Sequence, residues 1–373
     1  MSQKGEFVAG LPPFNITTPQ EIYSFNSTPM KLSKLLTWCL GILIIGSIIL
    51  FLRNHLGTAN QNRDNKEVPV LTVGFQVSPA MALIMVAKDK GLYEQQGLEV
   101  ELKEFTAGKF ALQAFFGGSL DVAVSGDVPV ALSTLQGNRT LVAGQVVAKT
   151  TNEVRVVARK ENGADDAKTF FSKKKRRLAT SFGGGPEFFT YEFINDLGIE
   201  RGRVELISQT PADMPAALVS GSVDAISIFD PFAYIAEKQM GDRAVTFTNP
   251  NVYSELYVIN VQPSVKEDNA KRESIEHFLR ALVEAEQFTA QNLEEAKQIV
   301  MKYTKLDKET IDGIWDNFDF RVVLTPQLLE FWNREAEWAK ETGKVGKDAP
   351  APDFREIVFE SPLKNISPER VGL

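Results

Sequence analysis

The sequence predicts an α/β protein with two similar lobes, preceded by one membrane-spanning helix. The first observation is an internal echo: the segment 118–127, GSLDVAVSGD, returns 103 residues later at 221–230 as GSVDAISIFD. The second is that the same order of segments precedes each copy: an apolar run, a proline-initiated helix and another apolar run. The third is an uncharged run at 35–52. Two lobes of like order imply a cleft between them.

The first lobe is expected to begin at Val68, where short apolar runs start to alternate with helical periodicity. Short strands separated by helices predict a parallel sheet with right-handed crossovers. An extended run at 154–158 would carry the chain into the second lobe, and another at 256–260 would carry it back. The expected strands are 71–75, 98–105, 121–125 and 140–147 in the first lobe, and 178–182, 204–208, 225–229 and 244–248 in the second.

Four helical segments follow the second crossing, and we expect them to return mainly to the first lobe. The first lobe is therefore assigned as 68–152 with 261–350. The second lobe is assigned as 153–260. The remaining segment, 351–373, is interpreted as a C-terminal tail.

The N-terminal 67 residues predict a tail, a span and a linker. Residues 1–34 are rich in Pro, Ser, Thr and Asn and predict a disordered cytoplasmic tail, while 53–67 is a polar linker. As a helix, 35–52 would extend about 27 Å, enough to cross a hydrocarbon core. The run is longer than the apolar part of a signal peptide, which favours a retained signal-anchor over cleavage after Ala59. Lys31 and Lys34 favour a cytoplasmic N-terminus, so a single-pass protein of the cell membrane would hold its lobes in the periplasm or outside the cell.

Composition argues against several classes of function. The net charge of −7 offers no global basic surface for nucleic acid, and the basic run 173–177 is interpreted as a solvated loop. The single cysteine, Cys39, lies inside the expected span. The two histidines, His55 and His277, have no metal-ligand partner at the usual spacing. We therefore expect no cofactor, no metal and no enzymatic activity.

Ligands of open parallel sheets bind beyond the carboxyl ends of the strands, and several such ends carry distinctive residues. Ser78 can cap the helix that Pro79 begins, and three consecutive glycines before another helix allow a ligand to approach the backbone. The candidate ligand-binding residues are Gln76, Ser78, Pro79, Ser125, Gly126, Asp127, Thr150, Thr151, Arg155, Gly183, Gly184, Gly185 and Asp230.

The two aspartates that end the echo, Asp127 and Asp230, occupy equivalent positions. If both face the cleft, they would repel a bare anion and suit an amine or a cationic ring; alternatively, each caps its own helix. Arg155 could bind a carboxylate or sulfonate through its guanidinium, or lie on the surface of a strand. Thr150 and Thr151 precede the first crossing and could reach the cleft floor or cap a loop.

Several motifs occur in a characteristic order: AKDKGLYEQQGL at 87–98, the two echo blocks, FGGG at 182–185, and Asp230-Pro231-Phe232. With these motifs the chain resembles the nitrate, sulfonate, taurine and thiamine-precursor branch of ABC-transporter substrate-binding proteins. The resemblance implies a two-lobed type II periplasmic-binding-protein fold that closes over a small solute. It also implies an ABC permease and its ATPase as partners, and it places ligand contacts at 76–79, 125–127, 183–185 and Asp230.

The leading interpretation is a membrane-anchored solute-binding subunit of an ABC importer. Its solute would be a small organic molecule, either similar to taurine or an alkylsulfonate, or bearing an amine. Two alternatives stay open: a membrane-tethered module that senses a ligand without transporting it, and an enzyme that reuses this fold.

Overall fold

The computed structural model describes residues 68–350 and 352–373, which belong to one compact unit. The expected tail, span and linker at 1–67 lie outside the described residues. Among the helices that are described, none combines the length and the apolar character that a membrane crossing requires.

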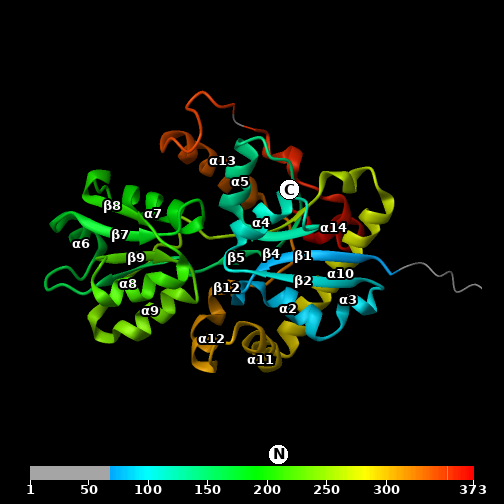
Figure 1. Cartoon of the computed structure of the whole chain (residues 1–373), viewed down its shortest axis with the longest axis horizontal. Helices are drawn as coiled ribbons and strands as arrows, with labels where there is room; N and C mark the ends of the chain where they lie inside the picture. The colour runs from blue at the N-terminus through cyan, green and yellow to red at the C-terminus, as the bar shows by residue number, and fades with distance from the viewer. Residues whose placement is uncertain (1–67, 351) are drawn as a thin grey trace, which may run out of the picture. The chain divides into compact units, whose positions relative to one another are not determined.

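The first lobe is built on a five-stranded sheet in the order β2-β1-β3-β11-β4 (Figure 1). Its first three strands are parallel, and β11 runs antiparallel to both of its neighbours. The strands are β1 (Val70–Gln76), β2 (Glu99–Phe105), β3 (Val122–Gly126), β4 (Leu141–Val147) and β11 (Tyr257–Val261). Helices α2, α3, α10 and α11 pack against one another, while α4 packs on β1 and β3.

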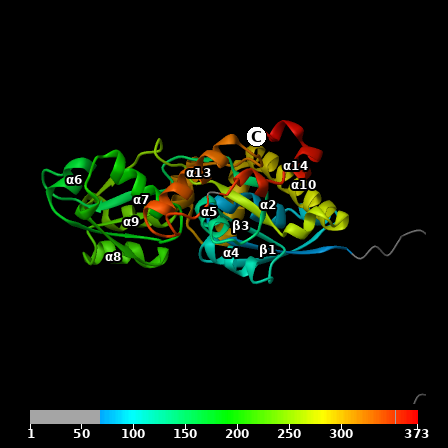
Figure 2. The same ribbon diagram turned by 90° about the horizontal axis from the view of Figure 1, so that it is seen from above.

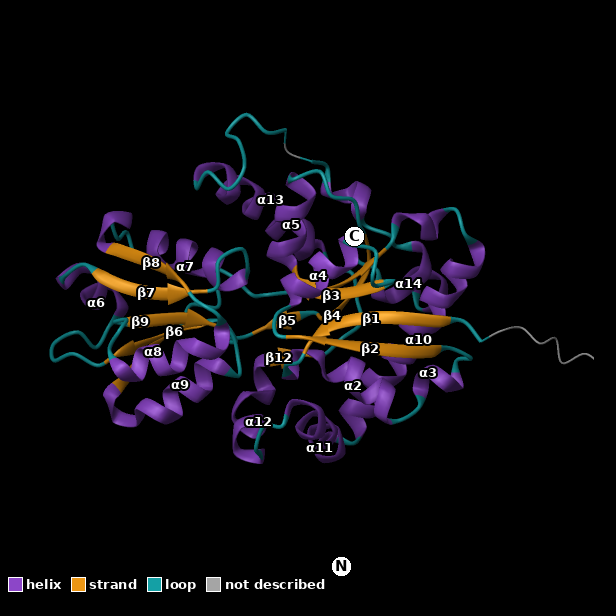
Figure 3. Ribbon diagram, in the orientation of Figure 1, coloured by secondary structure: helices purple, strands orange, loops and turns teal. Residues whose placement is uncertain are grey.

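The second lobe repeats this arrangement in the order β8-β7-β9-β6-β10 (Figure 3). Again three parallel strands are followed by one antiparallel strand, here β6, and by an outer strand. The strands are β6 (Arg155–Arg159), β7 (Arg176–Thr180), β8 (Val204–Ser208), β9 (Ala225–Ile228) and β10 (Ala244–Phe247). In each lobe the antiparallel strand is the one that enters from the other lobe, so the two lobes are topological copies.

Helices cover both sheets, as Figures 1 and 3 show. In Figures 1 and 2 alike, α13 lies between the lobe that contains α7 and the lobe that contains α10. The helices are α2 (Ala82–Asp89), α3 (Leu92–Gln95), α4 (Gly108–Phe116), α5 (Asp127–Leu135), α6 (Ala167–Lys173), α7 (Gly185–Asp196), α8 (Met214–Ser220), α9 (Phe232–Met240), α10 (Asn269–Gln291), α11 (Leu293–Thr304), α12 (Lys308–Ile314), α13 (Pro326–Glu341) and α14 (Ser361–Ile366).

The sequence echo has a structural cause at its first four positions. Gly118 and Gly221 follow a helix with φ of 79° and 80°, a left-handed conformation that favours glycine. The next residue, a serine, donates its hydroxyl to a carbonyl of the preceding helix. Two residues later, an aspartate accepts a backbone N–H from a neighbouring strand. Asp121 accepts it from Thr72 in β1, and Asp224 accepts it from Arg177 in β7. The repeated residues therefore join helix, turn and sheet in the same way in both lobes.

Two assigned boundaries need correction. Strand β11, which spans 257–261, hydrogen-bonds within the first sheet, although 257–260 had been assigned to the second lobe. Both sheets accept a fully buried apolar strand at this position, so its apolar run does not distinguish them. The segment 352–373 is no free tail, because Phe354 and Leu363 are buried and α14 packs on α10.

The basic run 173–177 is also more structured than a solvated loop. Arg176 is buried at the start of β7, where its guanidinium donates to Glu161 Oε2 at 2.7 Å. The same guanidinium lies 3.8 Å from the centroid of the Phe170 ring. A basic side chain in the core is thus neutralised by one carboxylate and stacked on one aromatic ring.

Candidate functional site

Turns from both lobes converge on the carboxylate of Glu255. This residue lies in the second crossing segment, between β10 and β11, and is only 5% exposed. A Cβ added to Gly126 would lie 2.5 Å from Glu255 Oε1, and one added to Gly185 would lie 2.7 Å from Oε2 of the same carboxylate. Gly126 has a φ of −64°, and Gly185 begins α7, so neither conformation is reserved for glycine. A side chain at either position would have to displace the Glu255 carboxylate.

Gln76 and Ser78, at the end of β1, belong to the same strand-end face. Gln76 Oε1 accepts a hydrogen bond from the Gly108 N–H at 3.1 Å, and a Cβ on Gly108 would lie 2.9 Å from Ser125 Cα. Gln76 therefore lies beside the 125–127 turn. Within the described part of the chain, Gln76 Nε2 and Ser78 Oγ are buried without a hydrogen-bond partner. Pro79 begins a short 3-10 helix directly after them.

Asp127 is fully buried at the start of α5 and faces other acids. Its Oδ1 accepts hydrogen bonds from Tyr253 Oη at 2.5 Å and from the Val128 N–H at 3.0 Å, while its Oδ2 has no partner among the described residues. Burial raises the pKa of Asp127 to about 7, and the Tyr253 hydrogen bond only partly opposes this rise. Burial, followed by the charge of Asp127, raises the pKa of Glu335 on α13.

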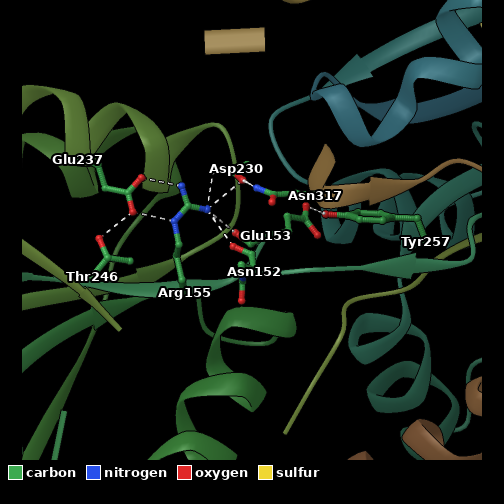
Figure 4. A network of polar contacts seen from close by, with 8 residues as sticks. All are labelled: Asn152, Glu153, Arg155, Asp230, Glu237, Thr246, Tyr257 and Asn317. Atoms are coloured by element: carbon green, nitrogen blue, oxygen red, sulfur yellow. Dashed lines mark hydrogen bonds and ion pairs between the residues drawn. The ribbon is translucent and has the colours of Figure 1, made fainter. Parts of the chain in front are cut away.

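Asp230 lies at the equivalent position of the second lobe but is neutralised by the protein itself (Figure 4). Its carboxylate lies 2.9 Å from Arg155 Nη1 and accepts a hydrogen bond of 2.7 Å from Asn317 Nδ2. Burial raises the pKa of Asp230, and the Arg155 charge opposes that rise. Its contacts therefore place Asp230 in a network of protein side chains.

Arg155 is at the centre of this network (Figure 4). Its Nε and Nη2 donate to the two carboxylate oxygens of Glu237, each at 2.8 Å, and its Nη1 also donates to the Asn152 carbonyl at 2.9 Å. Thr246 donates its hydroxyl to the same Glu237 carboxylate. The guanidinium is engaged on all its edges by protein acceptors, so these contacts do not support the expected role for Arg155 as a partner of a ligand anion.

Thr150 and Thr151 lie in the first crossing segment. The Thr150 N–H donates to Ser254 Oγ at 2.9 Å, and the Ser254 hydroxyl donates back to the Thr150 carbonyl at 2.8 Å. The Thr151 N–H donates to the Asn317 carbonyl at 2.8 Å. β5 (Lys149–Thr150) also pairs with β12 (Phe318–Asp319). Thr150 therefore joins the two crossing segments, and Thr151 is held beside β12.

The glycine turn at 183–185 does not present a free anion cradle. The Gly183 N–H donates to Glu187 Oε2 at 2.7 Å, so a carboxylate of this chain already occupies the position near the N-terminus of α7. Lys344 Nζ lies 2.7 Å from Glu187 Oε1 and compensates that charge. Gly184, the residue before α7, has an extended conformation with φ of −134°.

A cavity of about 740 Å³ opens between the lobes, and Val77, in the turn after β1, is part of its wall. Lys109 also lines it, and its Nζ donates to the Phe182 carbonyl of the other lobe at 2.8 Å. Burial lowers the pKa of Lys109. Most of the wall is apolar, and the lining residues are Val77, Glu104, Phe105, Thr106, Lys109, Phe110, Ser208, Gln209, Thr210, Pro211, Ala212 and Phe232.

Three carboxylates dominate this region and are not among the predicted site residues: Glu153, Glu255 and Glu335. For Glu335 a signal existed, since it falls on the apolar face of α13 in phase with Phe331 and Trp332. Glu255 stands between Ser254 and Leu256 in a loop, where sequence pattern carries no spacing rule. Its position depends on the tertiary contacts with Gly126 and Gly185.

Two lobes of copied topology, joined by two crossings around a cleft, correspond to the periplasmic-binding-protein fold. A model of the NMT1-like family matches residues 64–303, and the chain belongs to that family. A protein of Bacillus subtilis (strain 168), named provisionally as an aliphatic sulfonates-binding protein, is 22% identical over 335 residues, which cover 86% of this chain and 95% of the relative.

Solved structures show the same fold. The periplasmic aliphatic sulphonate binding protein SsuA from Escherichia coli is 20% identical with a TM-score of 0.66, covering 78% of this chain and 92% of that one. A ligand-binding component of an ABC-type import system from Staphylococcus aureus is 17% identical with a TM-score of 0.64, covering 80% of this chain and 99% of that one.

Proposed function

We propose that this chain is the solute-binding subunit of an ABC importer, held at the cell membrane by residues 35–52. The observation that carries the proposal is the convergence of strand-end turns from both lobes on one buried point, at Glu255. A solute at that point would contact both lobes at once. Relatives that include a component of an ABC-type import system support an ABC permease and its ATPase as partners.

The mechanism is closure about the hinge at Thr150 and Ser254. Several contacts hold the lobes together, including Lys109 with the Phe182 carbonyl and Lys344 with Glu187. A solute that contacts both lobes stabilises the closed arrangement over the open one, because only the closed arrangement offers both sets of contacts. The permease would then recognise the closed form, and the chain would bind its solute without transforming it.

The solute is a small organic molecule that bears a cationic group, with a zwitterion such as taurine as one possible form. Asp127 and Glu255 carry carboxyl groups without a protein cation against them, so these two groups offer a bare anion no countercharge. The names of relatives refer to sulfonates, and a zwitterion reconciles that chemistry with an acidic site.

Single-molecule fluorescence transfer on the full chain tests closure. Dyes would be placed at two exposed positions, Gln95 in the first lobe and Lys168 in the second, with Cys39 replaced by serine. Taurine and benzylamine are the probes. We expect a bound solute to move the population toward the shorter distance. A probe that binds and leaves the distribution unchanged contradicts the binding-subunit mechanism.

A further inference from the structure

We propose that Glu255, supported by Asp127 and Glu335, is the receptor for a protonated amine or amidinium of the solute. The inference rests on the proposed function and names the charge class of the ligand. It assigns the ligand cation to a residue of the second crossing segment, outside the strand-end turns that the sequence highlighted.

The position of the Glu255 carboxylate supports this role. The Glu255 carboxylate reaches the glycine turns of both lobes, at Gly126 and at Gly185. A charge held there contacts the end of β3 in one lobe and the start of α7 in the other. Glu255 lies on a crossing segment, so it belongs to neither lobe alone. A ligand atom bound to it is placed where closure brings the two lobes together.

The buried acids have more acceptor oxygens than hydrogen-bond donors around them. Four buried carboxyl groups lie near one another, and only two hydroxyl groups donate to them: Tyr253 to Asp127 and Tyr257 to Glu153, at 2.5 Å and 2.6 Å. In the described part of the chain, the oxygens left without a hydrogen-bond partner are Asp127 Oδ2, Glu153 Oε2, Glu255 Oε2 and both side-chain oxygens of Glu335. These oxygens can accept several donors from a ligand.

Basic side chains of this region are engaged by other groups. Lys109, in the cavity wall, donates to the Phe182 carbonyl. Arg155 is bound by Asp230 and Glu237, and Lys344 is bound by Glu187. Arg334 forms its ion pair with Glu192 and donates to the Val252 carbonyl at 2.7 Å. Among the described residues, no ion pair joins a basic side chain to Glu255. Burial and then the charges of Glu153 and Asp127 raise the pKa of Glu255.

Buried carboxylates without a cation are costly, so burial favours the protonated forms of these groups in the free protein. A ligand cation can take the place of those protons. A primary ammonium offers three donors and an amidinium offers a planar pair, both of which fit the unpartnered oxygens. The cavity between the lobes has an apolar wall with Phe105, Phe110 and Phe232, which suits a compact aromatic or aliphatic body.

The test compares two probes of like shape and opposite charge, benzylamine and phenylmethanesulfonate, by titration calorimetry on the full chain. We expect benzylamine to bind, and Glu255→Gln to weaken its binding roughly a hundredfold. Glu205→Gln is the matched control, because its carboxylate is 51% exposed in the second lobe, and it should leave binding unchanged. Circular dichroism confirms that each variant is folded, and Glu255→Asp should recover part of the affinity.

Three results overturn the proposal. If phenylmethanesulfonate binds and benzylamine does not, the cation site fails while the binding-subunit function stands. If benzylamine binds equally to wild type and to Glu255→Gln, the assignment to Glu255 fails. If neither probe binds, the result counts against the cation site and the proposed function together.

Discussion

Asp127 and Asp230 end the two copies of one sequence echo, yet the charged groups next to them differ. Asp230 has a guanidinium and a carboxamide against it, from Arg155 and Asn317. Asp127 has a tyrosine hydroxyl and a second buried acid, Glu335. The repeat places both carboxylates at the same point of the fold, and the neighbouring chain gives one a cation and leaves the other without one.

Removal of the cation from the second lobe should produce the largest effect. Arg155→Ala leaves Asp230 and Glu237 without their partner, and we expect the free energy of unfolding to fall by about 3–5 kcal/mol. Denaturant unfolding followed by circular dichroism measures it. Arg177→Ala, an exposed arginine of β7, is the control and should change stability by less than about 0.5 kcal/mol. If the two variants were equally stable, the ion pairs of Arg155 would not stabilise the fold.

The two aspartates themselves should respond differently to the same substitution. At a pH near 5.5, Asp230→Asn weakens charged hydrogen bonds and should cost about 1.5–3 kcal/mol. Asp127→Asn replaces a group that is already neutral at that pH, so it should cost less than about 1 kcal/mol. Thermal unfolding of both variants in one buffer gives the comparison. Similar losses would mean that the two sites are alike.

The close contact between Gly126 and Glu255 can be tested directly. Gly126→Ala would put a Cβ against Glu255, and we expect it to cost about 1–3 kcal/mol. In the double variant with Glu255→Ala this loss should largely disappear, because the obstructing atoms are gone. Gly184→Ala is the control, since its Cβ would make only ordinary contacts at 3.6 Å. A loss that persists in the double variant would show that Glu255 is not the obstacle.

The free protein should also show a pH dependence of stability. The pKa of Asp127 is raised from 3.8 to about 7 in the folded state, so between these values the folded protein keeps a proton that the unfolded chain has lost. The stability from this group is therefore fully present below about pH 4 and is lost as pH rises to about 7, by about 1.4 kcal/mol per pH unit. Unfolding between pH 5 and 7 measures this slope. Asp127→Asn should reduce it, and Glu205→Gln should not; stability that rises with pH would contradict the assignment.

Local patterns predicted much of the fold. Alternating runs located the strands, and the echo at 118 and 221 predicted two lobes of like topology. The candidate residues Gln76, Gly126 and Gly185 follow from the general position of strand ends. Charge pairing could not be predicted in this way, because Arg155 and Asn317 lie 75 and 87 residues from Asp230 in the sequence. Only the folded chain determines which aspartate has a cation.

The central claim is that a solute cation replaces protons on the acids around Glu255, and the protons released on binding test it most directly. Titration calorimetry with benzylamine at about pH 6, repeated in two buffers of different ionisation enthalpy, counts them. We predict net release by the full chain and a smaller release by Glu255→Gln. Binding of benzylamine with no release, or with proton uptake, would contradict the account.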